Sequence, residues 1–170
     1  MTSCLRNSLV SALIGAAILF AGCERGDAAD EAATASPDGF DRCTLAEDAE
    51  IEAVIGPHNG GKTEIDNMWG LQGCRWTANA VQKSEARGDW HEHIEITVFE
   101  DMLESWARGE AEGDPAPDVA PGALYNHLHG TLWFDCGGDR FCAVYVKIDS
   151  PERREQAAKQ FARLVLTRLR

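Results

Sequence analysis

The chain has 170 residues, of which 28 are acidic and 16 are basic, and its formal net charge is −12 at pH 7. Nucleic-acid binding requires a basic footprint, so this acid excess argues against a nucleic-acid partner. It also argues against electrostatic adhesion to anionic lipid, so that any membrane attachment must rest on apolar groups.

The amino terminus has the pattern of an export signal. Arg6 supplies a positive charge, and the uncharged apolar segment 9–20 has about a dozen residues, too few to span a bilayer alone. The segment closes on the tetrapeptide Phe-Ala-Gly-Cys at residues 20–23. A pair of small residues directly before a cysteine resembles the lipobox of bacterial lipoproteins, and this resemblance covers residues 1–23.

The resemblance implies a covalent lipid anchor at Cys23. In the lipoprotein family the cysteine thiol receives a diacylglyceryl group, the signal peptide is cut before it, and the new amino terminus often carries a further acyl chain. Residues 1–22 would then be removed, and two or three acyl chains would anchor the protein stably, since each buried methylene contributes about 0.8 kcal/mol. The expected location is the cell envelope, with the protein exposed to the periplasm or to the exterior.

The residues that follow the signal divide into a tether and a domain. Residues 23–42 are rich in alanine, aspartate and glutamate, and they cannot bury enough apolar surface to offset the entropy of ordering. We therefore expect an acidic disordered tether here. Residues 43–170 are enough for one hydrophobic core and not for two, which predicts a single domain.

The domain has an even set of cysteines, which suits disulfide bonds in an oxidising compartment. They are Cys43, Cys74, Cys136 and Cys142. Three pairings are open, and local geometry favours Cys136 with Cys142, because these residues flank a short hairpin; Cys43 then pairs with Cys74. The shorter bridge would stabilise the fold by about 2 kcal/mol and the longer one by about 3 to 4 kcal/mol.

The first predicted helix begins at a capping box, Thr44-x-x-Glu47, and carries apolar residues at helical spacing through Ile55. It ends at the following Gly-Pro pair, which gives about three turns. Residues 56–63 match the phosphate-loop pattern G-x-x-x-x-G-K-T, a chemistry that needs a buried strand before the loop and a helix after it. Neither is predicted here, so we interpret the segment as a Gly-rich turn and expect no bound nucleotide.

Four strands and a short helix are predicted in the middle of the domain. Residues 74–77 form a short strand, and residues 90–99 alternate in polarity as in a half-buried antiparallel strand. The short helix follows, and then a solvated loop rich in proline and glycine covers residues 109–122. Residues 131–136 and 142–148 form a hairpin in which both cysteines point to the apolar side.

The last helix has the clearest signals. Ser150 is a predicted N-cap, Pro151 takes the first helical position, and an apolar stripe continues to Leu169. These elements predict an α+β domain in which helices pack on one face of an antiparallel sheet. A cysteine before the first helix and the Cys-Arg-Trp strand at residues 74–76 resemble small secreted lipoproteins of unknown function, a likeness that carries no active-site motif.

Two His-x-His pairs are the candidates for a metal site. His91, His93 and Glu95 share one strand face, and His127 with His129 would do likewise if that segment continues into the next strand. Paired strands could bring the two groups together, and imidazole with carboxylate suits zinc, copper or nickel. The alternative is that these histidines are only solvated, and no other cofactor is expected.

No nucleophile or acid–base set stands out, because Ser84, Ser105 and Ser150 lack a Gly-x-Ser-x-Gly frame and the cysteines serve as bridges. Trp133 and Tyr145 fall on the outer sheet face. There they either form a binding surface or lie under the acidic loop of residues 109–122. We therefore predict a non-catalytic, lipid-anchored module that binds an envelope protein or a small ligand through this face. The alternative function is a metal-binding lipoprotein that uses the His-x-His pairs, and a hydrolase is disfavoured.

Overall fold

The computed structural model describes residues 40–66, 71–85 and 88–169; the expected signal peptide, Cys23 and the first part of the tether lie outside the described residues. The described residues form a single α+β domain with a seven-stranded antiparallel sheet and three α-helices, which confirms the predicted fold class. The elements are the 3₁₀-helix η1 (Arg42–Leu45), α1 (Asp48–Ile55), β1 (His58–Asp66), β2 (Leu71–Ser84), β3 (Gly88–Phe99), α2 (Asp101–Glu110), β4 (Asp114–Pro115), β5 (Leu124–Asn126), β6 (Thr131–Gly137), β7 (Arg140–Lys147) and α3 (Pro151–Arg168).

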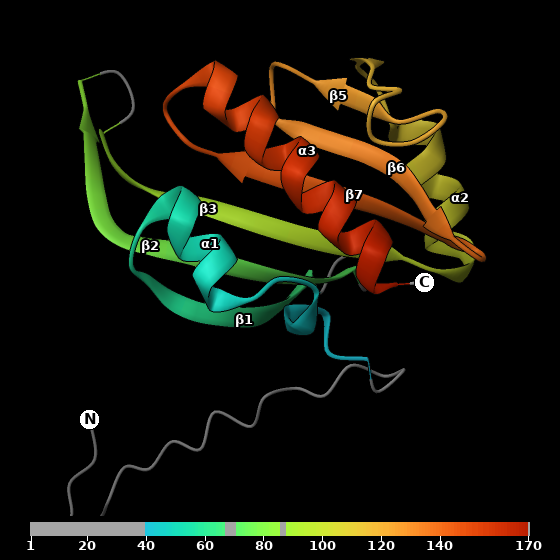
Figure 1. Ribbon diagram of the computed structural model, residues 1–170, viewed down its shortest axis with the longest axis horizontal. Helices are drawn as coiled ribbons and strands as arrows, with labels where there is room; N and C mark the ends of the chain where they lie inside the picture. The colour runs from blue at the N-terminus through green and yellow to red at the C-terminus, as the bar shows by residue number, and fades with distance from the viewer. Residues whose placement is uncertain (1–39, 67–70, 86–87, 170) are drawn as a thin grey trace, which may run out of the picture. The chain divides into compact units, whose positions relative to one another are not determined.

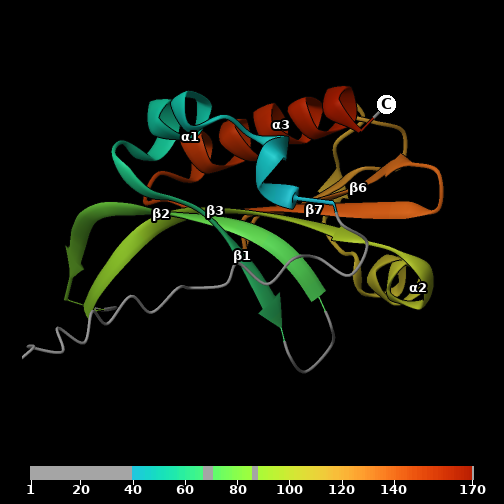
Figure 2. The same cartoon turned by 90° about the horizontal axis from the view of Figure 1, so that it is seen from below.

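The strand order is β1-β2-β3-β7-β6-β5-β4, so β3 and β7 lie side by side although they are far apart in the chain. Helices α1 and α3 lie over one face of this sheet (Figure 1). Figure 2 shows that α2 lies on the opposite side, where the end of β3 leads into it. We call the face under α1 and α3 the inner face and the opposite one the outer face.

The inner face holds the main hydrophobic core. Ile94 and Ile96 of β3, Val144 and Val146 of β7, and Phe161 of α3 are fully buried in it. These are the positions at which the alternation of the strands and the apolar stripe of the last helix predict burial. Each such side chain contributes about 1.5 to 3 kcal/mol when it is removed from water. The apolar packing between α3 and the inner face is therefore a major source of stability.

Helix α3 is fixed at both ends. The side chain of Ser150 accepts a hydrogen bond from the Arg153 amide at 3.3 Å, which confirms the predicted N-cap. Near the other end, Arg168 donates to both carboxylate oxygens of Glu50 in α1, at 2.8 and 2.9 Å. This bidentate pair ties the two helices of the inner face together.

The outer face has a smaller apolar cluster of its own at one end. Phe99, Phe141 and Ala143 are buried there together with Ala107 of α2, and Trp133 packs against them. Helix α2 therefore covers the end of the outer face where β3 finishes, and its apolar side is used for this contact.

The start of the first helix was predicted wrongly. Thr44 does not cap Glu47; its hydroxyl donates to the Asp41 carbonyl at 2.7 Å, and the Asp41 carboxylate accepts from the Cys43 amide. These bonds close η1 as a separate turn. The capping box lies three residues later, between Glu47 and Glu50, so α1 has eight residues rather than three turns.

The Gly-rich segment is a strand and not a turn. From His58 onward its residues belong to β1, which pairs with β2 in the register Gly61 to Trp76 and Lys62 to Arg75, with an irregularity after His58. A Cβ at Gly61 would lie 2.6 Å from Nε1 of Trp76, so the glycine is required for the buried indole to pack. A helix precedes this segment and a strand continues through it, which is not the context of a phosphate loop.

Both disulfides have the pairing that local geometry favours. Cys43 pairs with Cys74, which ties η1 to β2, and Cys136 pairs with Cys142 across the β6–β7 hairpin. The turn of this hairpin has two residues instead of the expected five, because β6 continues through Gly137. The short strands β4 and β5, which extend the sheet beyond β6, were not predicted.

The two bridges should differ in their contribution to stability. Replacing Cys43 and Cys74 together by alanine should lower the free energy of unfolding by about 3 to 4 kcal/mol, since 31 positions separate the two cysteines. The matched change at Cys136 and Cys142, which are 6 positions apart, should cost about 2 kcal/mol. Urea denaturation of the two double variants measures both values, and an equal or reversed order would contradict the loop-entropy account.

Candidate functional site

The outer face carries a polar patch over the strands at the centre of the sheet. Its members are half-buried, and each lies next to at least one strand residue that is buried in the inner core. We call it the outer-face patch, and it consists of Arg75, Thr77, His93, Glu95, Thr131 and Tyr145.

The register of the strands arranges these residues in rows across the sheet. One row runs from Arg75 on β2 through Glu95 on β3 and Tyr145 on β7 to Thr131 on β6. Directly opposed residues of antiparallel strands have Cβ atoms about 4.5 to 5.5 Å apart, so their side chains interact on one face. The patch is therefore a product of four strands and not of one local motif.

Arg75 and Glu95 form the charged part of the patch. Nε and Nη2 of Arg75 donate to Oε2 of Glu95 at 2.9 and 2.6 Å, and Thr97 donates to Oε1 at 3.4 Å. The side chains of the pair are 35% and 25% exposed, so solvent reaches both. A Cβ at Gly73 would lie 3.0 Å from the Thr97 hydroxyl, and the glycine leaves room for this bond. The two opposite charges compensate each other within the patch.

His93 contacts the ring of Tyr145. The ring centroids are 5.2 Å apart and the planes are tilted by 52°. Burial is the largest influence on the imidazole and lowers its pKa, and the nearby charges of Arg75 and Lys147 act in the same direction. His93 is therefore held neutral at pH 7, with one ring nitrogen able to donate and the other able to accept.

Trp133 stands at the border between the patch and α2. It is paired with Ala143, and its ring lies 5.9 Å from Phe99 and 6.1 Å from Phe141 between centroids. The small side chain of Ala143 leaves space for the indole to extend across β7 toward both phenyl rings. Trp133 is thus half-buried among aromatic rings beside α2, and Ala111, at the start of the loop 109–122, packs against the same cluster.

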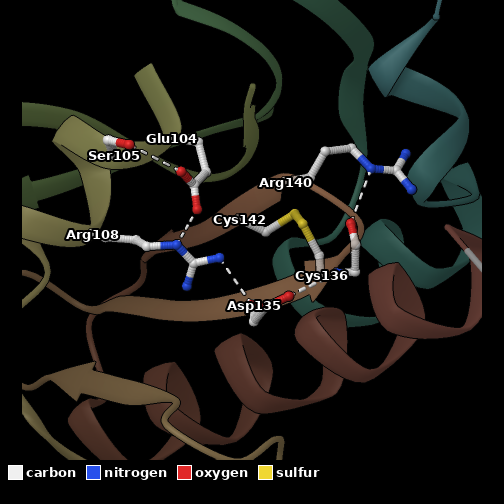
Figure 3. Close-up of polar contacts among 8 residues, drawn as sticks. Glu104, Ser105, Arg108, Asp135, Cys136, Arg140 and Cys142 are labelled. Carbon is white, nitrogen blue, oxygen red and sulfur yellow. Dashed lines mark hydrogen bonds and ion pairs between the residues drawn. A yellow bond between two sulfur atoms is a disulfide. The ribbon is translucent and has the colours of Figure 1, made fainter. Parts of the chain in front are cut away.

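A second charged group holds α2 on the outer face. Figure 3 shows Arg108 of α2 between Glu104 on the same helix and Asp135 on β6, and the bond to Asp135 measures 2.9 Å. The guanidinium also lies 4.7 Å from the centre of the Phe141 ring. The Gly137 amide, followed by Arg108, lowers the pKa of Asp135 below its ordinary value.

The structure does not join the two His-x-His pairs into one site. His127 and His129 lie in a turn instead of a strand, and β7 separates β6 from the strand that carries His91 and His93. His127 is instead 3.2 Å from a carboxylate oxygen of Asp114. Among residues 40–66, 71–85 and 88–169, no group of three or more histidine, cysteine, aspartate or glutamate side chains is arranged to hold a metal ion. Paired strands therefore do not bring His91, His93 and Glu95 together with His127 and His129, and metal binding by either pair stays a prediction.

A shallow pocket of about 410 Å³ lies elsewhere, at the edge of the inner face. It is formed where the loop before β5 meets the end of β6 and the last turns of α3, and Asp118 holds this loop against α3 through Lys159 and Arg163. The pocket is lined by Val119, Ala120, Pro121, Asp135, Cys136, Gly137 and Leu166. Its walls are largely apolar, and its carboxylate is already paired with Arg108.

Comparison of the chain with protein-family models, with curated proteins and with solved structures found no match. In the part of the chain that the structure describes, none of the helices is both long and apolar enough to span a bilayer. The interpretation of the site therefore depends on its geometry and chemistry.

Sequence reasoning named three members of the outer-face patch, together with Trp133 at its border, and missed the other three. Tyr145, Trp133, His93 and Glu95 follow from strand alternation, whereas the pairing of Glu95 with Arg75 requires the β2–β3 register. One signal was present, because Arg75 lies between two buried core residues and must therefore point outward.

The titration of His93 tests its environment. We expect its imidazole to titrate below the ordinary histidine pKa of about 6.5, because burial disfavours the charged form. The folded state then binds fewer protons than the unfolded state, so the stability that His93 contributes falls as the pH drops through the unfolded value. Ring proton resonances followed by NMR, with His93→Gln for assignment, measure the value, and a pKa at or above 6.5 would contradict this environment.

The bond between Asp135 and Arg108 gives a second pH-dependent prediction. Asp135→Asn should lower the free energy of unfolding at pH 7 by up to about 1 kcal/mol, since this half-exposed pair is screened by solvent. Because the Gly137 amide, and after it Arg108, depresses the folded pKa of Asp135, the contribution of this carboxylate is full above about pH 4 and is lost as the pH falls through the folded value. Urea denaturation at several pH values measures it, with Asp139→Asn in the adjacent exposed turn as the control. A difference that persists unchanged in acid would refute the assignment.

Proposed function

We propose that this chain is a lipid-anchored protein of the cell envelope, and that its domain is a non-catalytic module that binds a partner or ligand through the outer face. The observation that carries the proposal is the unequal use of the two sheet faces. Helices α1 and α3 pack on the inner face, whereas the outer face retains half-exposed polar and aromatic side chains beside α2.

The state of the cysteines supports the envelope location. Both cysteine pairs of the domain are bridged, and such bonds form and persist in oxidising compartments outside the cytosol. A protein reaches such a compartment by export, and residues 1–23 have the pattern of a lipoprotein export signal. Cys23 is then the lipidated residue, and Phe40, the first of the described residues, packs against the core.

The charges of the outer face support binding over catalysis. Glu95 is compensated by Arg75, and Asp135 is compensated by Arg108 and the Gly137 amide. An acid–base catalyst needs a carboxyl group whose pKa is moved toward the working pH, whereas the pKa of Asp135 is moved away from it. A sheet face with compensated charges and half-exposed rings is suited to recognition.

The lipid anchor gives the direct test of the location. When the full chain is expressed in a bacterium fed with an alkyne-bearing fatty acid, we expect label in the membrane fraction and loss of essentially all label in Cys23→Ser. The reason is that the Cys23 thiol is the proposed acceptor of the diacylglyceryl group. In-gel fluorescence after coupling to an azide dye measures the incorporation.

A matched cysteine provides the control for this experiment. Cys4 lies in the segment proposed to be removed, so Cys4→Ser should retain full labelling. Label that remains in Cys23→Ser, or an intact mass that corresponds to an uncut chain, would contradict the proposed anchor.

A further inference from the structure

We propose that the outer-face patch and Trp133 at its border bind an uncharged glycan, with a sugar ring resting on Tyr145, a second at the uncovered part of Trp133, and sugar hydroxyls bonded to the Arg75–Glu95 pair. This inference rests on the proposed function, because it names the ligand class for the same surface. A glycan chain is recognised by two kinds of group together, namely aromatic ring faces and fixed polar side chains, and the patch has both.

The aromatic part comes from two adjacent strands. Tyr145 on β7 is paired with Thr131 on β6, and Trp133 on β6 is paired with Ala143 on β7, so the two rings are diagonal neighbours. Such diagonal neighbours lie about 7 to 8 Å apart. The face of an aromatic ring is electronegative and attracts the polarised C–H groups of a sugar ring. Thr131, which lies opposite Tyr145, is small, whereas Trp133 offers only the part of its half-buried indole that Leu124, Phe99 and Phe141 do not cover.

The polar part lies in the same row as Tyr145. The guanidinium of Arg75 and the carboxylate of Glu95 are held together by two bonds, so their donors and acceptors have a fixed geometry. A carboxylate has about four acceptor sites, and the described bonds from Arg75 and Thr97 use three. Neutral His93, in contact with the Tyr145 ring, adds a group that both donates and accepts.

The charges at the patch favour an uncharged ligand, because Glu95 is paired with Arg75 and the amine of Lys147, opposite His93, lies 5.3 Å from the centre of the Trp90 ring. The chain as a whole has a formal charge of −12, which repels polyanions. A polycation would need uncompensated carboxylates at the contact, whereas Glu95 is paired with Arg75. A ligand rich in hydroxyl groups fits this surface because it can bond to the ion pair without separating it, while a strongly charged ligand would have to compete with the pair.

Calorimetric titration of the full chain in detergent, with cellotetraose and with the tetrasaccharide of β-1,4-linked N-acetylglucosamine, tests the inference. We expect saturable binding of at least one of these two probes. Tyr145→Ala should weaken it by about tenfold, which corresponds to about 1.4 kcal/mol, because the stacking ring is lost. Tyr145→Phe keeps the ring and should stay within about twofold of the parent chain. Leu128→Ala, on a turn outside the patch where the side chain is 82% exposed, should bind like the parent.

Failure of this inference can be distinguished from failure of the proposed function. Near-ultraviolet circular dichroism first establishes that each variant is folded. Absence of binding for both tetrasaccharides, or equal binding by folded Tyr145→Ala, overturns the glycan inference.

A photo-crosslinking residue at position 131 then reports the contacts of the patch in cells. Crosslinks to a protein overturn the glycan ligand but keep the outer face as the binding surface. Crosslinks from position 128 and none from position 131 overturn both proposals.

Discussion

The pairing of β3 with β7 is the constraint on which the rest of this domain depends. It joins β1, β2 and β3 to β6 and β7, and in the chain these two groups are separated by α2 and by the segment that contains β4 and β5. On the inner face it places Ile94 and Ile96 beside Val146 and Val144, which is the surface that α3 covers. On the outer face the same register places Glu95 beside Tyr145. One set of backbone bonds thus builds both the core and the candidate site.

The two faces of the sheet divide stability from recognition. Large apolar side chains fill the space between the inner face and the helices α1 and α3. One disulfide bonds η1 to β2, and the other bonds β6 to β7 within their hairpin. The middle of the outer face is therefore not needed to close the core, and it can retain polar side chains at little cost in burial. Helix α2 is held in place by the bond between Arg108 and Asp135, and it covers the part of the outer face that adjoins the outer-face patch at Trp133.

Local signals in the sequence predicted the elements whose stability is itself local. The capped helix that begins at Ser150, the alternating strand at residues 90–99 and the cysteine-flanked hairpin all carry enough pattern to be read alone. Strand β1 was missed because its glycines disfavour a strand, and only its pairing with β2 and the packing of Trp76 over Gly61 make it one. The rows of the outer-face patch were also beyond prediction, since they depend on non-local register. The sequence placed Tyr145 outward but could not place it beside Glu95.

A slip of the β3–β7 register by one residue would turn every side chain of one strand to the other face. The contact between His93 on β3 and Tyr145 on β7 therefore tests this register. The most direct measurement is the set of nuclear Overhauser effects from their ring protons in the folded chain. The arrangement described here requires effects between these two rings, whose centroids are 5.2 Å apart. Effects that connect either ring to Phe161 in the core under α3 would contradict it.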